Sequence, residues 1–131
     1  MQMNDDALWH LDNNGMELVF CCLNTNARNY ARLGQLMLNR GRWNDQQLVP
    51  ADFVKKMTQP GLVEHYGLST WLGMHKDPAY FWFSGHLGQH IVVIPEHDMI
   101  VVRLGERTEP EADHVKHTAP ELVSVGLSLI D

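Results

Sequence analysis

The 131-residue sequence lacks any run of lysine and arginine, any long apolar segment and any spaced pair of cysteines. Its formal net charge is −6, so it has no basic footprint of the kind that binds nucleic acid or anionic membranes. The aliphatic run Ile91-Val92-Val93-Ile94 is far shorter than the roughly 20 residues of a membrane helix. The acidic, polar opening at residues 1–6 is unlike a signal peptide. We therefore expect neither nucleic acid nor a membrane as a partner.

Both cysteines, Cys21 and Cys22, are adjacent in the chain. Because a structural disulfide needs a larger Cα separation than neighbouring residues have, we expect two small buried apolar side chains. A thiolate zinc site is not expected either, since the chain has no second cysteine cluster. The residues predict no cofactor.

Histidines and carboxylates give no convincing metal site. His86 and His90 share a strand face but lie about 13 Å apart along a strand, too far to hold one ion. A second group could lie close together in a polar stretch: Glu111, Asp113, His114 and His117. Because its spacing matches no established site, we interpret it as a solvated loop and predict no metal.

Length and composition are those of one globular domain. With 44% apolar and 20% charged residues, the chain can bury a single core. An apolar stripe with helical spacing predicts a helix near residues 25–40, ended by Gly41 in a left-handed conformation. Pro50 at a first helical position, with Lys55 and Lys56 at the far end, predicts a short helix that ends before Gln59.

Aromatic and β-branched residues predict strands in the second half of the chain. The segments are 80–83, 90–94 and 99–104, and the connection Pro95–Asp98 has the length of a hairpin, which favours antiparallel pairing. Thr118 and Glu121 have capping-box spacing before an apolar helical stripe, so we expect a closing helix from Thr118. The fold class predicted is α+β, an antiparallel sheet of about three strands flanked by helices. The central strands are apolar on both faces, which predicts burial on both sides and a need for more cover than the chain supplies.

Ordered segments along the chain resemble the class C β-lactamase-like (penicillin-recognising) serine hydrolases. In order and spacing the resemblance runs over most of the chain, a specificity that no single short motif has. It rests on Gly15–Gly34, Leu38–Pro50, Tyr66-Gly67 with Trp71, Ser84–Gln89, Ile94-Pro95 and Val101–Gly105. The 6-aminohexanoate-dimer hydrolase and esterase branch is the most similar, although Asn26 and Asn29 depart from the expected helix motif. The resemblance implies that residues 1–131 form a single domain, the C-terminal half of a β-lactamase/transpeptidase-like fold.

The catalytic serine of that family is missing from this chain. Such enzymes take a serine and a lysine from S-x-x-K and a tyrosine from Y-x-N. The residues three positions before the lysines are Asp52, Phe53, Gly73 and Asp113, and those two positions after the tyrosines are Arg32, Leu68 and Trp82. Neither motif is present. The half that carries S-x-x-K and Y-x-N is therefore expected to be absent.

His86-Leu87-Gly88 matches the late active-site motif, which we expect at the start of a strand. By resemblance, His86 contacts the substrate, Gly88 allows a close approach, and the backbone N–H of Gln89 supplies one oxyanion donor. Ser84, Gly85, Leu87 and Trp71 would line the substrate pocket. From the residues alone, the favoured interpretation of His86 is a hydrogen-bonded surface histidine at a strand end. Trp71, Trp9 and Trp82 could line a pocket, but aromatic residues of this size more often fill a core.

Three functional hypotheses stay open. The leading one is a serine hydrolase fragment for amides or esters, inactive alone, that supplies the oxyanion edge. The alternative is a non-catalytic or degenerate module that self-associates through its exposed sheet as a homo-oligomer. The third is that a separate chain supplies the nucleophile. A self-sufficient Ser-His-Asp triad using His86 also stays open, because triads are recognised by geometry, although none of the serines lies in a G-x-S-x-G motif.

Enzyme status and location also stay open. The sequence leaves undecided whether this chain is itself an enzyme. If Met1 is the true start, a cytoplasmic location follows, whereas the resemblance also allows a periplasmic one for a full-length family member.

Overall fold

The computed structural model describes residues 7–105 and 114–130, and the side chains of the second range from Thr118 onward. Its centre is a four-stranded antiparallel sheet of order β5-β6-β7-β8. The strands are β5 (Trp71–Gly73), β6 (Tyr80–Ser84), β7 (His90–Ile94) and β8 (Met99–Arg103). The last three confirm the predicted strands, with Ile94 opposite Met99 across the predicted hairpin.

Strand β5 was not predicted. It has three residues and pairs with β6 through Trp71 opposite Trp82 and Gly73 opposite Tyr80. A strand this short, ending in glycine, has no alternating pattern that distinguishes it from a loop. Pairing with the aromatic strand β6 is what orders it.

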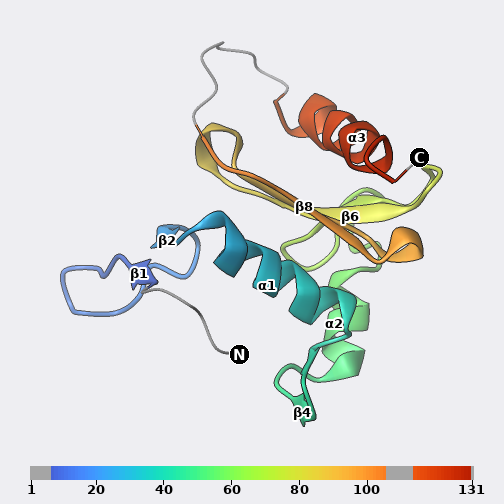
Figure 1. The fold of residues 1–131 in the computed structure, drawn as a ribbon. Coiled ribbons are helices and arrows are strands. Elements are labelled where there is room, and N and C mark those ends of the chain that lie inside the picture. Colours follow the sequence, from blue (N-terminus) through green and yellow to red (C-terminus); the bar gives the residue numbers. More distant parts are fainter. Residues whose placement is uncertain (1–6, 106–113, 131) are drawn as a thin grey trace.

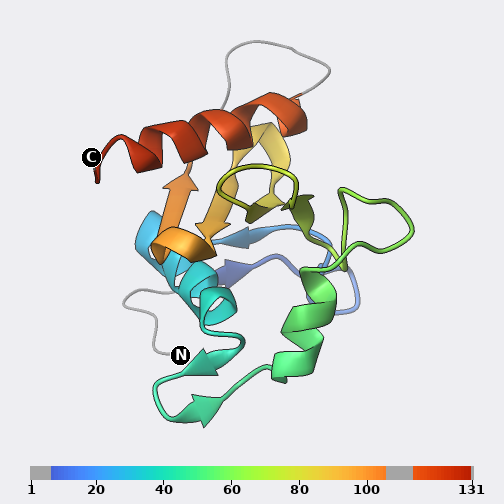
Figure 2. The ribbon, with the colours of Figure 1, turned by 90° about the vertical axis from the view of Figure 1, so that its right-hand side faces the viewer.

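Helices cover both faces of the sheet, as Figures 1 and 2 show. Helix α1 (Ala27–Leu38) contacts β7 and β8 on one face, and α3 (His114–Leu127) contacts the same strands on the other. The prediction that the sheet needs cover on both faces is confirmed. The expectation that the chain lacks the material is wrong, because Val92, Val93 and Ile94 have no exposed surface.

Alternation along the strands divides the apolar side chains into two cores. The α1-side core contains Met37, Val54, Leu72, Phe81, Ile91 and Val93. The α3-side core contains Tyr80, Trp82, Val92, Ile94, Ala119 and Val123. At about 25 cal/mol per Å² of buried apolar surface, these two cores supply the main favourable term in folding.

Helix α1 begins and ends through local polar contacts. The Asn26 side chain caps it by accepting a hydrogen bond from the Asn29 N–H at 2.9 Å. Asn29 is fully buried, and its carboxamide accepts from Arg32 at 2.7 Å and donates to Thr25 at 2.8 Å. Gly41 has the predicted left-handed conformation, with φ of 82°.

Smaller elements surround this framework. Hairpins β1 (Leu8–Trp9) with β2 (Leu23–Asn24), and β3 (Arg42–Trp43) with β4 (Gln46–Gln47), flank α1. Helix α2 (Ala51–Met57) has Pro50 as its N-cap, one position before the predicted one, and ends before Gln59 as predicted. In the described ranges, no helix combines the length and apolar character needed to cross a bilayer.

Two local predictions are wrong. Helix α3 starts at His114, so Thr118 lies inside the helix and is buried, as is Ala119 in the α3-side core. Packing against the sheet, and not the capping box, sets this part of the helix. Cys21 and Cys22 are joined by a disulfide, with Cα atoms 3.7 Å apart, and both are half-buried. Cys22 accommodates the tight connection with a φ of 74°.

Candidate functional site

The predicted motif lies in the turn between β6 and β7. His86–Gly88 form a 3₁₀ turn, η1, and β7 begins only at His90. The expectation that the motif starts a strand is therefore wrong by a few residues. The turn closes through a hydrogen bond from the Gly85 N–H to the Gln89 carbonyl at 2.7 Å, and Ser84 pairs with His90 below it.

Two consecutive left-handed residues give the turn its shape. Leu87 has a φ of 59° and Gly88 a φ of 88°. Glycine adopts this conformation without steric cost, whereas for leucine it costs about 1 kcal/mol. Gly88 is also buried. Glycine at this position therefore allows the left-handed backbone conformation of the turn.

Most of the turn is open to solvent. Gly85 and His86 are exposed, Leu87 is 46% exposed, and Ser84 and Gln89 are half-buried. The exposure of His86 agrees with both interpretations of this residue, a substrate contact and a surface histidine. The turn therefore has a small exposed surface, and its backbone is held by contacts on its buried side.

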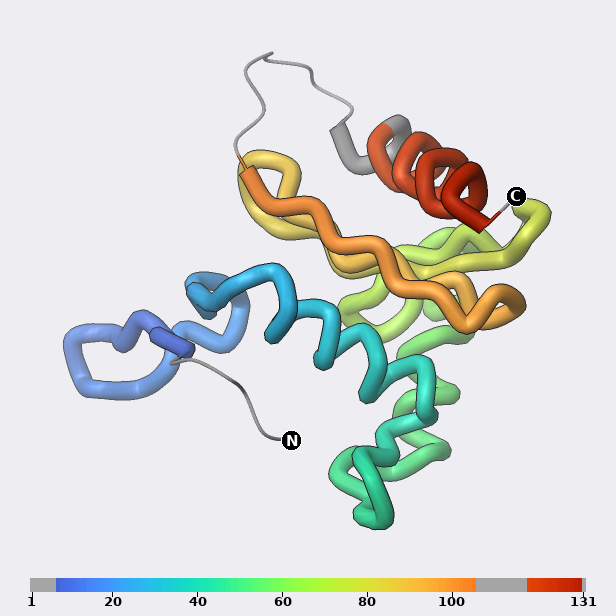
Figure 3. Tube along the Cα trace, viewed as in Figure 1, coloured from blue at the N-terminus to red at the C-terminus, as the bar shows by residue number. Residues whose placement is uncertain are grey.

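One side chain of the turn, Gln89, and one of β8, Arg103, fix the turn to the end of β8. The Gln89 carboxamide donates to the Gly105 carbonyl at 3.1 Å and accepts from the Gly105 N–H at 2.8 Å. Arg103 donates through Nη1 to the carbonyls of Gly88 and Gly105, the latter at 3.0 Å. In Figure 3 this turn lies beside the end of β8.

Sequence reasoning missed Arg103 and Gly105. The signal was present, because counting outward from the Pro95–Asp98 hairpin places Arg103 opposite His90. A single arginine that ends an apolar strand is a further sign of a specific partner. In the described part of the chain Arg103 forms no ion pair with a carboxylate.

Trp71 contacts other aromatic side chains. Its ring stacks on Trp82 at a centroid distance of 5.9 Å and meets Tyr66 edge-on at 4.8 Å. Trp71 packs against the α3-side core, as the core interpretation predicts for it and for Trp82. Trp9 is 43% exposed, and its indole donates to the carbonyls of Leu18 and Cys21.

His90 is 2% exposed inside β7, while His86 is exposed in the turn. Among the described residues, no cluster of three or more histidine, cysteine or acidic side chains is arranged to hold a metal ion. Glu111 and Asp113 lie outside the described residues, as do the side chains of His114 and His117. The interpretation of that stretch therefore stays a prediction.

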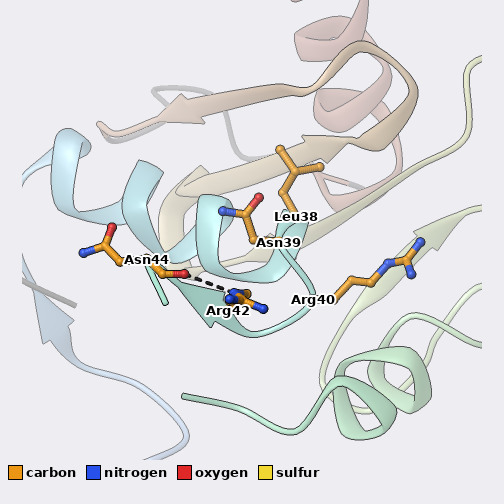
Figure 4. A pocket seen from close by; sticks show the side chains of 5 residues that line it. All are labelled: Leu38, Asn39, Arg40, Arg42 and Asn44. Carbon is orange, nitrogen blue, oxygen red and sulfur yellow. Dashed lines mark hydrogen bonds between the residues drawn. The ribbon is translucent and has the colours of Figure 1, made fainter. Parts of the chain in front are cut away.

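A surface hollow of about 310 Å³ lies at the C-terminal end of α1. Its lining residues are Leu38, Asn39, Arg40, Arg42 and Asn44. Figure 4 shows that they do not converge, because Arg40 extends away from Arg42. Arg42 is engaged by the Asn44 carbonyl at 3.1 Å and by Asp45 at 3.7 Å. Figure 1 places this end of α1 away from the β6–β7 turn, so the hollow is not part of the site.

Comparison with known proteins tests the fold. No protein-family model and no curated protein matches the chain. Solved structures do match, 24 chains in all, among them "Putative 6-aminohexanoate-dimer hydrolase from Bacillus anthracis", with a TM-score of 0.78 and 23% sequence identity. The likeness shows the fold. It covers 95% of this chain and 34% of that one, so this chain spans about a third of the length of the hydrolase neighbour.

The hydrolase neighbour confirms the coarser part of the sequence resemblance. The chain has an α+β fold with small antiparallel sheets, like the matching third of that hydrolase. Identity of 23% does not extend to the roles of single residues. The division into domains, the catalytic assignments and the substrate stay predictions.

Proposed function

We propose that this chain is the oxyanion-binding part of a serine hydrolase for amides or esters, with its nucleophile supplied from outside the chain. The β6–β7 turn with Gln89 is the element that would face the substrate. The fold shared with the hydrolase neighbour supports this assignment, as does the absence of S-x-x-K and Y-x-N from the sequence.

The hydrogen bonding of Gln89 is the observation that carries the proposal. Its carbonyl accepts from Gly85, and its side chain is bound to Gly105. Among the backbone hydrogen bonds of the described turns, loops and caps, none is donated by its N–H. An N–H that is fixed in a half-exposed turn and takes part in none of these bonds is suited to bind an oxygen that becomes negatively charged.

The chemistry assigned to this turn follows from acyl transfer. The serine oxygen from the missing part bonds to the substrate carbonyl carbon, and the carbonyl oxygen takes up negative charge. The Gln89 N–H and a second donor hold that oxygen until the bond to the leaving group breaks and the leaving group takes a proton. Water then hydrolyses the acyl-enzyme. Exposed His86 contacts the substrate beside this oxygen, with Ser84, Gly85 and Leu87 forming the adjoining wall.

A chimera tests the proposal. This chain replaces the matching third of the hydrolase neighbour, and hydrolysis of a p-nitrophenyl ester is measured together with labelling by a fluorophosphonate. We expect the isolated chain to be unlabelled, and the chimera to be labelled at a serine from the neighbour's portion and to release nitrophenol. The unmodified neighbour serves as the control for activity, and circular dichroism as the control for folding.

Two results would contradict it. Stoichiometric labelling of the isolated chain, for example at Ser84, would show that the nucleophile is present after all. A folded chimera that fails to hydrolyse an ester cleaved by the neighbour would show that this turn cannot serve as an oxyanion site.

A non-catalytic module that self-associates is the second candidate. Its original ground, exposed central strands, is wrong because α1 and α3 cover both faces. Exposed apolar side chains on the loop between β1 and β2 favour it instead, with Val19 at 81% and Phe20 at 82% exposure. Association through such side chains would occur without any hydrolase activity.

A further inference from the structure

We propose that Arg103 and the Gln89 side chain are positioning residues that fix and polarise the backbone N–H of Gln89. This inference rests on the proposed function for its catalytic meaning. The structural part of it, the control of one peptide group by one guanidinium, can be tested separately.

The argument begins with the peptide group between Gly88 and Gln89. The Gly88 carbonyl and the Gln89 N–H belong to one planar unit and point in opposite directions. Arg103 Nη1 donates to this carbonyl oxygen from β8. Holding the oxygen on the β8 side therefore aims the N–H away from β8.

Glycine makes this peptide group easy to rotate. Rotation needs changes in ψ of Gly88 and φ of Gln89, and Gly88, with a φ of 88°, tolerates more backbone conformations than any other residue would. Without a contact on its oxygen, the group could adopt two orientations with the N–H on opposite sides. A charge-assisted hydrogen bond from a guanidinium selects one of them.

The Gln89 side chain prevents the same rotation from the other side. Its two hydrogen bonds to the Gly105 backbone form a closed ring that fixes the position of the residue. Arg103 also donates to the Gly105 carbonyl at 3.0 Å, so both side chains share one anchor. The clamp consists of Gly88, Gln89, Arg103 and Gly105, and it joins the turn to the end of β8.

Polarisation follows from the same contact. A positively charged donor on a carbonyl oxygen draws electron density from the amide nitrogen and makes the N–H of that peptide group a stronger donor. Arg103 has no carboxylate partner among the described residues, so its charge is not neutralised within this part of the structure. An oxyanion donor benefits from both fixed direction and increased strength.

The experiment is ¹⁵N NMR on the uniformly labelled chain with Arg103→Met, Arg103→Lys and a matched control, Arg32→Met. Arg32 also donates to a side-chain oxygen, that of Asn29, but lies on α1. We expect Arg103→Met to move the Gln89 amide nitrogen upfield and broaden its signal by exchange, Arg103→Lys to restore most of the native shift, and Arg32→Met to leave it unchanged.

An unchanged Gln89 amide in Arg103→Met would overturn the proposal. If that variant does not fold, the Arg103 Nη protons of the native chain are measured instead. A bound guanidinium gives Nη protons that exchange slowly and resolve separately. Averaged Arg103 signals, like those of a solvated arginine, would also overturn it.

Catalytic meaning is tested in the chimera. There Arg103→Met should lower kcat roughly 10²-fold with little change in KM, as expected when a donor acts on the transition state. An inactive native chimera with a shifted Gln89 amide would reject the proposed function and leave the clamp intact. An active chimera in which Arg103→Met has native kcat would reject the clamp as a positioning device.

Discussion

Each of the three polar groups of Gln89 has a different role. Its carbonyl closes the β6–β7 turn and its carboxamide binds Gly105. Its N–H is the group that we propose as the oxyanion donor. This division makes the N–H testable without destroying the turn. The φ of Gln89 is −74°, which lies in the range that proline imposes.

Gln89→Pro removes the N–H, and Gln89→Ala removes only the carboxamide. In the chimera we expect Gln89→Pro to have a kcat roughly 10² to 10³ below that of Gln89→Ala, the usual loss for one oxyanion donor. Steady-state kinetics on a p-nitrophenyl ester measure the difference. Equal kcat values in the two variants would assign the donor to another residue.

Tyr80 gives a pH-dependent prediction at the same scale. Burial in the α3-side core raises the pKa of its phenol from the ordinary value of 10.0. The folded protein therefore favours neutral Tyr80, and this contribution to stability is complete below pH 10 and lost as the pH rises through the folded pKa.

Urea denaturation between pH 9 and pH 11 should show this loss, and Tyr80→Phe should reduce its slope. Tyr66→Phe serves as the control, since Tyr66 contacts Trp71 from a half-buried position. An identical slope in native chain and Tyr80→Phe would mean that other groups determine the alkaline limit.

Two helices approach β8 closely, each through a glycine. A Cβ at Gly34 of α1 would lie 2.7 Å from Cγ2 of Ile100. A Cβ at Gly126 of α3 would lie 2.8 Å from the Met99 sulfur and from Cγ2 of Val101. These distances are too short for carbon and sulfur atoms, so the helix or the facing side chain must shift to accept alanine.

We expect Gly34→Ala and Gly126→Ala each to lower the free energy of unfolding by about 1 to 3 kcal/mol, as overpacking does. The better helix propensity of alanine would offset up to about 1 kcal/mol of this. Chemical denaturation measures it, with Ser124→Ala on the exposed side of α3 as control. A higher free energy of unfolding in both variants would contradict the prediction, because it would show that the helices and β8 accept the added methyl group without strain.

At the scale of the whole molecule, the described residues form a sheet covered on both faces, but the surface around it carries exposed apolar side chains. The sheet is covered on both faces, yet large apolar side chains remain exposed outside it, including Met16, Val19 and Phe20. The hydrolase neighbour is about three times as long as the part that matches. Such side chains are suited to contacts with further polypeptide.

Light scattering and sedimentation over a range of concentrations test association of the isolated chain. We expect concentration-dependent self-association that Phe20→Asp reduces, because a charge opposes burial of that loop. Val125→Asp, on the exposed side of α3, should have no such effect. A monomer at every concentration would leave the self-associating module without support.

Local patterns predicted the regular elements well. The strands at 80–84, 90–94 and 99–103 are recognisable from β-branched and aromatic residues, and helix α1 from its apolar spacing and Gly41. Each signal lies within a segment of a dozen residues or fewer, where alternation or helical period is determined by the side chains themselves.

The sequence by itself determined these elements, the two-sided burial of the central strands and the absence of the early catalytic motifs. Only the tertiary structure decided that Trp71 belongs to a short fourth strand, that α3 extends back to His114, and that Arg103 reaches the carbonyl of Gly88. The physical reason is separation along the chain, because each of these depends on a partner from another element that no local pattern specifies.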